Sequence, residues 1–358
     1  MAKSIYVAAT SQHVGKTTST LGLVAALQES GVQVGYCKPV GQEFLDLGDL
    51  RVDKDALLFS KVMGFNLYAD LHSPVILGRG ATTSYLDRPT AFAYREQIQK
   101  ASKALESQND IVIYEGTGHP GVGSVVDLSN ADVAKLVGAE VVIIVEGGIG
   151  NTIDRLCLCL PKFRELNVPV RGVIVNKTRP DKLDKVKYYV GKKLEEMNLP
   201  LLGVMPYDKS LSNPIMDTIV DAVNGRVLRF EENLDNRVED YVSGSLVDTD
   251  EMGNSPQNQL LVVSHKRLGE ALGKIKQISQ EKNLSECLLS GILITGDGRH
   301  ELPVGHFALS DEYIEEHRIP IVSTPLDTLG SVVKISRIEV KINTRTPWKS
   351  RRAIELIK

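Results

Sequence analysis

Ile-Tyr-Val-Ala-Ala-Thr-Ser-Gln-His-Val-Gly-Lys-Thr-Thr-Ser-Thr-Leu, residues 5–21, decides the fold that we expect for the first half of the chain. Residues 5–9 are apolar and rich in β-branched and aromatic side chains, which predicts a buried strand. A polar loop runs to Val14, and apolar residues then recur with helical spacing from Leu21 to Leu27. A strand, a loop, Gly-Lys-Thr and a helix form the context of a phosphate-binding loop.

Such a loop binds phosphate because backbone N–H groups at the start of the helix point at the anion and the helix dipole adds positive potential. Lys16 would reach the β- and γ-phosphates, and the hydroxyl of Thr17 would be a ligand of Mg²⁺. The usual pattern has glycine where this chain has Thr10, so an ordinary strand–helix turn with a solvated lysine is the alternative. The residues expected to bind nucleotide here are His13, Val14, Gly15, Lys16, Thr17 and Thr18.

Lys38 is a second candidate for the site. The run Val32–Val40 predicts a strand that Pro39 ends, which leaves Lys38 extended at the carboxyl end. Ligands of open α/β sheets bind at that edge, although a plain surface lysine is equally compatible with the sequence. We expect the neighbouring Cys37 to be a buried apolar filler.

Carboxylates occur at two further strand or helix ends. Asp53 and Asp55 lie where a helix begins, so they are either caps of its first turn or ligands of Mg²⁺. The buried run Ile111–Tyr114 ends in Glu115, which is the form of a Walker B element. The glycines that follow, Gly116 and Gly118, allow a ligand to approach the backbone closely.

Further apolar runs at 141–145, 170–175 and 201–205 alternate with helical segments. This alternation predicts an α/β fold with a parallel sheet covered by helices on both faces. Asn176 ends one of these strands and would hydrogen-bond a nucleotide base, or it is a polar turn residue. Arg179 stands where a guanine-selecting aspartate would be expected, which favours adenine.

The second half predicts a smaller α/β domain after a linker near 207–217. Its turn at Gly296–Arg299 lies at a strand end, where a plain turn is the simpler interpretation than a ligand contact. The segment from Lys334 onward is basic and has few aromatic residues. We expect it to be solvated or to pack in an oligomer rather than to bind nucleic acid.

Composition limits the function classes. The chain has 358 residues, a formal net charge of −3 and four scattered cysteines. These values give no reason to expect nucleic acid or an anionic membrane as a partner. The absence of a long apolar run and of a leader sequence, together with cysteines suited to the reduced state, predicts a cytoplasmic protein.

Several of these stretches resemble dethiobiotin synthetases. They are the loop 10–18, Lys38-Pro-Val40, Asp55-Ala-Leu57, Glu115-Gly-Thr-Gly118, Asn176 and Gly203-Val-Met-Pro206. That family also lacks the first glycine of the loop. The second half is similar to the DRTGG domain through Tyr241–Ser245, Gly291–Gly296 and Pro320–Thr328. Together the halves resemble the regulatory N-terminal part of long bacterial phosphate acetyltransferases.

The resemblance implies a dethiobiotin synthetase-like P-loop domain at 1–210, a DRTGG-like domain at 216–333 and a basic tail at 334–358. It implies ATP and Mg²⁺ as ligands, with Lys16 and Lys38 as catalytic groups and Asn176 on adenine. Thr17, Asp55 and Glu115 would hold Mg²⁺. The substrate side would be formed by Gly116, Thr117, Gly118 and His119, where His119 replaces a glycine of the family. The resemblance also suggests a homodimer or a higher homo-oligomer.

Two functions follow. The first is a MgATP-binding regulatory module that responds to nucleotide. The second is an ATP-dependent ligase that phosphorylates a carboxylate or carbamate, with a small carboxylate or amine as partner; the residues leave open whether the protein is an enzyme. Cobyrinic acid amide synthases share the first domain type but carry a glutaminase domain that we do not find in this sequence. A membrane-cycling ATPase of the cell-division type is disfavoured, because Ser11 stands where a second lysine is expected.

Overall fold

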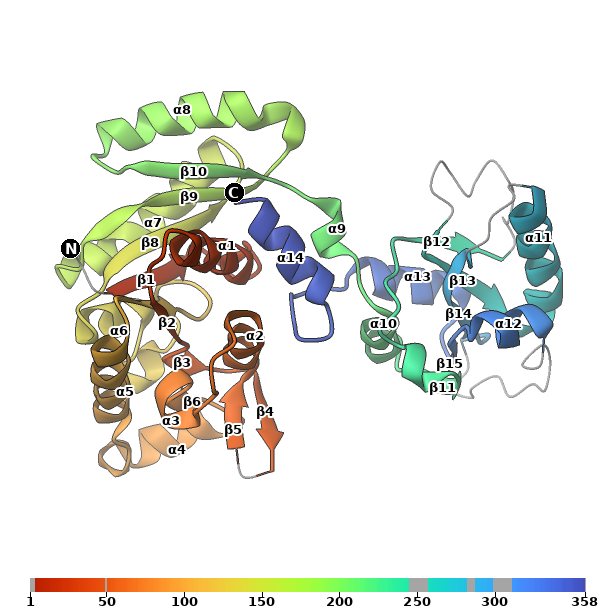
Figure 1. Ribbon diagram of the computed structural model, residues 1–358, viewed down its shortest axis with the longest axis horizontal. Helices are drawn as coiled ribbons and strands as arrows, with labels where there is room; N and C mark the ends of the chain where they lie inside the picture. Colours follow the sequence, from red (N-terminus) through yellow and green to blue (C-terminus); the bar gives the residue numbers. More distant parts are fainter. Residues whose placement is uncertain (1–3, 49, 245–256, 282–286, 299–310, 358) are drawn as a thin grey trace. The chain divides into compact units, whose positions relative to one another are not determined.

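The computed structural model describes residues 4–48, 50–244, 257–281, 287–298 and 311–357 (Figure 1). The chain forms two compact units. Unit 1 contains Met1–Asp208 and Ile342–Lys358, and unit 2 contains Lys209–Lys341. The chain therefore leaves unit 1 once and returns to it near the carboxyl end.

Unit 1 is built on a six-stranded sheet with the order β10-β9-β8-β1-β7-β2, in which every neighbouring pair is parallel. Its strands are β1 (Ser4–Ala9), β2 (Val34–Cys37), β7 (Ile111–Glu115), β8 (Glu140–Glu146), β9 (Val170–Thr178) and β10 (Leu201–Pro206). Each of the six apolar runs predicted as a strand is found in this sheet. The predicted fold class, a parallel α/β sheet with a second smaller domain, is confirmed.

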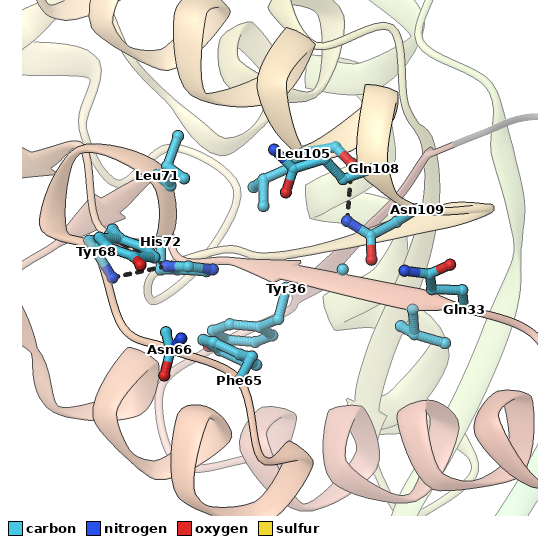
Figure 2. Close-up of a pocket in the computed structure, with 12 residues that line it drawn as sticks. Gln33, Tyr36, Phe65, Asn66, Tyr68, Leu71, His72, Leu105, Gln108 and Asn109 are labelled. Carbon is cyan, nitrogen blue, oxygen red and sulfur yellow. Dashed lines mark hydrogen bonds between the residues drawn. The ribbon is translucent and has the colours of Figure 1, made fainter.

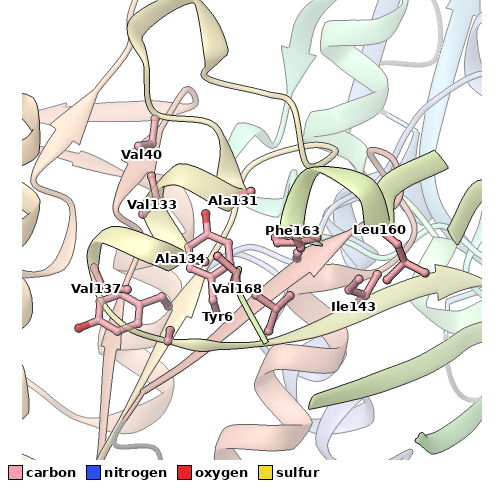
Figure 3. Packing of buried hydrophobic residues seen from close by; sticks show 14 of the residues in the cluster. Tyr6, Val40, Ala131, Val133, Ala134, Val137, Ile143, Leu160, Phe163 and Val168 are labelled. Atoms are coloured by element: carbon pink, nitrogen blue, oxygen red, sulfur yellow. The ribbon is translucent and has the colours of Figure 1, made fainter. Parts of the chain in front are cut away.

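Helices cover both faces of this sheet (Figure 1). They are α1 (Lys16–Glu29), α2 (Lys54–Met63), α5 (Tyr94–Gln108), α6 (Asn130–Leu136), α7 (Gly150–Glu165), α8 (Leu183–Glu196) and α14 (Pro347–Glu355). Because strand side chains alternate, Tyr6 and Ala8 of β1 pack in one core with residues of α5, α6, α7 and α8. Figure 3 shows this packing around Tyr6, Ile143 and Phe163. Val7 and Ala9 pack in the opposite core, with residues of α1, α2 and α14.

Smaller elements occupy the stretch between β2 and α5. They are β3 (Val40–Gly41), β4 (Phe44–Leu47), β5 (Leu50–Asp53), α3 (Ala69–His72), β6 (Val75–Ile76) and α4 (Ala81–Asp87). Residues 41–51 and 73–86 show no regular apolar period and would be taken for loops from the sequence, yet the first stretch contains β4 and the start of β5, and the second contains β6 and most of α4. β4 and β5 form an antiparallel hairpin, in which Asp46 lies opposite Arg51 and pairs with it at 2.6 Å. Such cross-strand charge pairs favour a hairpin but leave little trace in apolar periodicity.

The carboxyl-terminal segment differs from the solvated or oligomer-packing segment that we expected. Helix α14 packs against α1, and Ile342 and Ala353 are buried in the core between the sheet and these helices. Gly22 of α1 makes the close approach possible, because a Cβ atom there would lie 2.1 Å from the Ile357 side chain. The basic residues Arg351 and Arg352 are exposed, so the segment is amphipathic rather than uniformly solvated.

We predict that this helix stabilises unit 1. Replacing Ala353 by aspartate would bury a charge without a partner and should lower the free energy of unfolding by about 2–4 kcal/mol. The measurement is urea unfolding followed by the fluorescence of Trp348, the single tryptophan of the chain, which lies on α14. Arg351→Asp is the matched control, because Arg351 is exposed on the same helix and its replacement should change stability by no more than about 0.5 kcal/mol. Equal stabilities of the two variants would contradict the role of α14.

Unit 2 contains a five-stranded mixed sheet with the order β11-β15-β14-β13-β12. Its elements are α9 (Lys209–Ser212), α10 (Met216–Ala222), β11 (Arg226–Arg229), β12 (Asp240–Ser243), β13 (Gln259–Ser264), α11 (Leu268–Glu281), β14 (Leu289–Thr295), α12 (Glu312–His317), β15 (Ile321–Thr324) and α13 (Thr328–Ser336). Only β11 is antiparallel to its neighbour. Residues of α11 and α12 pack on one face, and residues of α10 and α13 pack on the other. The predicted small α/β domain is thus present as a mixed sheet.

Within the described ranges, the structure contains no helix that combines the length and the apolar character needed to cross a bilayer.

Candidate functional site

The candidate site lies where four parallel strands of unit 1 end. The phosphate loop (residues 10–18) follows β1, Lys38 follows β2, Glu115 ends β7, and Asn176 lies near the end of β9. Carboxyl ends of parallel strands meet at one edge of a sheet, which is why residues distant in sequence converge here.

The phosphate loop changes direction at Gly15, whose φ of 89° is in the left-handed region that favours glycine. A Cβ atom at Gly15 would lie 2.0 Å from Nδ2 of Asn176, so the site excludes any larger residue. Gly15 directly precedes α1 and offers no side chain to cap it, and the first turn of α1 contains no acidic residue. The first amides of α1 are therefore suited to receive an anion.

Two residues of β9 hold this loop in place. Asn176 donates from Nδ2 to the carbonyl of Val14 at 2.9 Å, and its Oδ1 accepts from the amide of Lys177 at 2.8 Å. Lys177 donates from Nζ to the carbonyl of His13 at 2.5 Å. The side chain of Asn176 thus supports the phosphate loop. Its predicted contact with adenine would use the second hydrogen of Nδ2 and stays a prediction.

Lys38, Asp55, Glu115 and Thr17 form a connected cluster beside the loop. Lys38 donates from Nζ to Asp55 Oδ2 at 2.7 Å and to the carbonyl of Gly116 at 3.1 Å, and it lies 3.5 Å from Glu115 Oε1. The hydroxyl of Thr17 donates to Glu115 Oε1 at 2.9 Å. The sequence therefore identified four residues that the fold brings into contact.

Burial makes the charges of this cluster interdependent. Lys38 is 4% exposed and Glu115 is 0% exposed. Burial alone would lower the pKa of Lys38, but the carboxylates of Asp55 and Glu115 raise it above its usual value. Burial raises the pKa of Glu115, and the opposing positive charge of Lys38 limits that rise. Lys38 therefore remains charged and compensates the two carboxylates.

Asp53 is the N-cap of α2, as one of the two readings of the sequence predicted. Its Oδ1 accepts from the amide of Asp55 at 2.8 Å. Asp53 is 2% exposed, and burial raises its pKa to about 7, with Lys38 acting in the opposite direction. Gly41 accommodates this carboxylate, because a Cβ atom there would lie 2.5 Å from Asp53 Oδ2.

We predict that Asp53 makes stability depend on pH. In the folded state the carboxyl group of Asp53 keeps its proton up to about pH 7. In the unfolded chain the same group loses its proton near pH 3.8, which is its usual pKa. The folded state holds more protons between these values, so the stability contributed by Asp53 is lost as the pH rises from about 4 to 7. Asparagine is also a good N-cap but cannot ionise. The free energy of unfolding of Asp53→Asn should therefore fall less steeply with pH than that of the natural chain, by at most about 1.4 kcal/mol per pH unit. Urea unfolding at several pH values tests this, and an unchanged slope would contradict it.

The turn after β7 is held by Asn130, a residue that the sequence did not single out. Asn130 donates from Nδ2 to the carbonyls of Thr117 and His119, at 2.8 and 2.6 Å. Its Oδ1 accepts from the amide of Thr117 at 3.0 Å and from the hydroxyl of Tyr6 at 2.7 Å. One buried amide therefore fixes the conformation of the turn. The capping box of Ser129 and Asp132 was a sequence signal for the start of α6, but it does not indicate this role.

The residues expected on the substrate side lie along this turn. The hydroxyl of Thr117 donates to the carbonyl of Val40 at 2.5 Å, and a Cβ atom at Gly116 would lie 2.5 Å from Asn130 Oδ1. His119 is exposed, and its Nδ1 accepts from the amide of Gly121 at 3.2 Å. That His119 takes part in substrate binding remains a prediction. In the second unit, the turn at 296–299 is described as far as Gly298, and Arg299 lies outside the described residues, as does Ser245.

The residues of the cluster fit Mg²⁺ when a nucleotide supplies further oxygens. Magnesium is commonly held by one or two carboxylates together with water and substrate phosphates. Thr17 and Glu115 place a hydroxyl and a carboxylate 2.9 Å apart next to the phosphate loop, and Asp55 lies 2.7 Å from Nζ of Lys38. Among the residues that the structure describes, no group of three or more His, Cys, Asp or Glu could hold a metal by itself.

Comparisons with known proteins identify distant relatives of this chain. A cobyric acid synthase of Carboxydothermus hydrogenoformans is 26% identical over 269 residues, which cover 68% of this chain and 51% of that protein. A phosphate acetyltransferase of Nitrosomonas europaea is 25% identical over 252 residues, covering 67% and 34%. The ATP-dependent dethiobiotin synthetase BioD of Methanocaldococcus jannaschii is 27% identical over 209 residues, covering 56% and 92%. The chain thus spans about half, or less, of the first two relatives.

Among solved structures, the MinD cell division protein of Aquifex aeolicus is similar in fold, at 15% identity and a TM-score of 0.38, covering 59% of this chain and 84% of that one. A model of the AAA_26 family, described as an AAA domain, matches residues 3–215, which is more than half of the chain. The protein therefore belongs to the AAA_26 family of AAA domains, and unit 1 is a P-loop NTPase domain distantly homologous to dethiobiotin synthetases, cobyric acid synthases and phosphate acetyltransferases.

Proposed function

We propose that unit 1 binds MgATP and that the protein is a regulatory module that responds to this nucleotide. The observation that carries the proposal is the contact of Thr17 with Glu115 beside the uncapped start of α1. This contact supports a magnesium site formed by Thr17 and Glu115 next to amides suited to phosphate. Lys16 would neutralise the β- and γ-phosphates, and Asp55 would complete the metal site.

The regulatory part of the proposal rests on the second half of the chain. Unit 2 follows the phosphate-loop domain in the order seen in the N-terminal part of long phosphate acetyltransferases, which its sequence resembles. The similarity to the Nitrosomonas europaea phosphate acetyltransferase covers 67% of this chain but 34% of that enzyme. We propose that unit 2 is a DRTGG-like domain through which the nucleotide state of unit 1 is sensed.

Isothermal titration calorimetry of the whole chain with ATP, ADP and GTP, with and without millimolar Mg²⁺, tests the binding step. We expect binding of adenine nucleotides that strengthens with Mg²⁺, and weaker binding of GTP. Hydrogen exchange with and without MgATP tests the regulatory step, with altered protection expected in unit 2. No adenine nucleotide binding would reject the first step, and unchanged exchange in unit 2 would reject the second.

An ATP-dependent ligase is the second candidate, and the position of Lys38 favours it. Its Nζ lies 3.1 Å from the carbonyl of Gly116 and 3.5 Å from Glu115, where it could stabilise charge on a transferring phosphoryl group or a carbamate. The similarity to BioD of Methanocaldococcus jannaschii, which covers 92% of that protein, also supports it.

This candidate predicts ADP release that depends on an added small carboxylate or amine and is lost in Lys38→Ala. The fold of that variant is checked by Trp348 fluorescence. Two panels of small molecules, diamines in one and dicarboxylates in the other, distinguish the two substrate classes. If no compound stimulates ADP release while MgATP still binds, the regulatory module remains and the ligase is rejected.

A further inference from the structure

A cavity of about 310 Å³ lies along β2 (Figure 2). β2 is the last strand of the sheet, so among the described residues no strand pairs with its outer edge. The walls come from β2 and the residue before it, from the segment between α2 and α3, from α3 itself, and from the end of α5 and the residue after it. Gly35 lets the side chain of Asn109 lie close to the strand, because a Cβ atom there would lie 2.7 Å from Nδ2 of Asn109.

The lining combines aromatic rings with side-chain amides and contains no Asp, Glu, Lys or Arg. Phe65 and His72 stack with ring centroids 4.4 Å apart, and Tyr68 lies 6.3 Å from His72. Figure 2 shows Tyr68 and His72 on one side of the cavity and the amides of Gln33 and Asn109 on the other. Burial lowers the pKa of His72, which favours its neutral form. The cavity is therefore uncharged, with planar surfaces and hydrogen-bonding ends.

The amides have hydrogen-bonding capacity left for a ligand. Within the described part of the chain, no residue hydrogen-bonds the side-chain amides of Gln33, Asn66 or Gln108. Asn109 donates from Nδ2 to the carbonyl of Leu105 at 2.8 Å, so its Oδ1 is left to accept a hydrogen bond from a ligand. Small-molecule sites typically join apolar and aromatic walls to a few such polar groups, and a volume near 300 Å³ suits a molecule of one or two rings.

We propose that this cavity binds a small, neutral, planar molecule that carries an amide or a ring nitrogen, and that its occupancy is coupled to the nucleotide site. The ring would stack on the aromatic wall, and its polar edge would pair with the amides. A charged ligand would lose its hydration without finding an opposite charge.

Two contacts connect the cavity with the cluster around Glu115. Tyr36 lines the cavity, and its hydroxyl donates to Glu115 Oε2 at 3.4 Å. His72 also lines the cavity, and its carbonyl accepts from the backbone amide of Lys38 at 2.8 Å. Tyr36 is fully buried, so a ligand in the cavity would act on Glu115 through the packing around this ring, and on Lys38 through the backbone of His72. Coupling of this kind is reciprocal, because each ligand changes the affinity of the other by the same factor.

The binding step is tested on the whole chain without nucleotide, so it does not depend on the proposed function. Benzamide and benzoate are titrated separately and followed by amide shifts in ¹H–¹⁵N spectra. We expect benzamide to shift resonances of residues 33–36 and 65–72 and to bind at least ten-fold more tightly than benzoate, which has the same shape but is charged. Equal affinities, or shifts elsewhere only, would overturn the site.

A pair of variants localises the binding. Asn66→Trp, at an exposed residue of the lining, fills the cavity and should weaken benzamide binding at least ten-fold. Lys103→Trp adds the same ring at an exposed position of α5 outside the lining and should leave the affinity unchanged. Unaltered binding in Asn66→Trp would also overturn the site.

The coupling step rests on the proposed function and uses MgATP calorimetry with and without saturating benzamide. We expect benzamide to strengthen MgATP binding at least two-fold in the natural chain. Tyr36→Phe keeps the ring and removes the hydroxyl, so it should still bind benzamide but lose this effect. If benzamide does not change the MgATP affinity of the natural chain, the coupling is overturned. If MgATP does not bind at all, the proposed function is rejected, and the cavity is then judged by the benzamide titration alone.

Discussion

Replacing Lys16 by alanine is expected to weaken MgATP binding at least about 30-fold, since losing one partner of a buried charge pair commonly costs about 2 kcal/mol or more. Lys16 is the first residue of α1 and follows Gly15, whose left-handed conformation fixes the direction of the loop. Its ammonium group would be the main positive charge on the β- and γ-phosphates. Calorimetry with MgATP measures the effect.

The control for this prediction is Lys61→Ala. Lys61 is an exposed lysine in the last turn of α2, so its removal changes the net charge equally and should alter the affinity less than two-fold. Thermal unfolding of both variants establishes that each is folded. A Lys16→Ala protein that is folded and binds MgATP as the natural chain does would refute phosphate binding at this loop.

Replacing Lys38 by methionine should have the largest effect on stability. Methionine keeps most of the volume of the side chain but removes the charge that pairs with Asp55 at 2.7 Å and approaches Glu115 at 3.5 Å. Both carboxylates would then lack their cation, and Glu115 is fully buried. Breaking a buried pair in this way costs about 3–5 kcal/mol. Urea unfolding at pH 8, followed by Trp348 fluorescence, measures the loss.

The double variant Lys38→Met/Glu115→Gln separates this cause from a simple packing defect. If the uncompensated charge is responsible, removal of the Glu115 carboxylate should restore more than half of the lost stability. Millimolar Mg²⁺ should also stabilise Lys38→Met, because an ion that binds only the folded state shifts the unfolding equilibrium. The double variant should respond less to Mg²⁺. Equal stability of the single and double variants would show that charge compensation is not the reason.

The sequence predicted the parts of the structure that depend on local pattern. The six strands of the main sheet of unit 1 are apolar runs between turn residues, and each of these runs was predicted as a strand. Convergence of Thr17, Lys38 and Glu115 followed from the rule that carboxyl ends of parallel strands meet at one edge. The roles proposed for these residues remain predictions, but their proximity could be expected from strand ends alone.

Other parts could not be predicted because they depend on contacts between distant segments. Asn130 supports the turn after β7 through backbone groups that no residue spacing identifies. The segment after Lys334 has a high average charge, which suggested solvation, yet Ile342 and Ala353 are buried against α1. Average composition does not reveal which face of a helix carries the charge. Likewise, Tyr36 is an ordinary strand residue in the sequence, and only the fold shows its hydroxyl near Glu115.

The return of the chain to unit 1 after residue 341 has a consequence for biosynthesis. Helix α14 covers α1, yet the ribosome makes it only after all 133 residues of unit 2, from Lys209 to Lys341. At ordinary elongation rates the interval is roughly 7 to 27 seconds. During that interval the face of α1 around Gly22, which later packs against α14 and Ile357, is not yet covered by that helix. Chaperones that recognise uncovered helix faces would therefore find this target on the nascent chain before α14 is made.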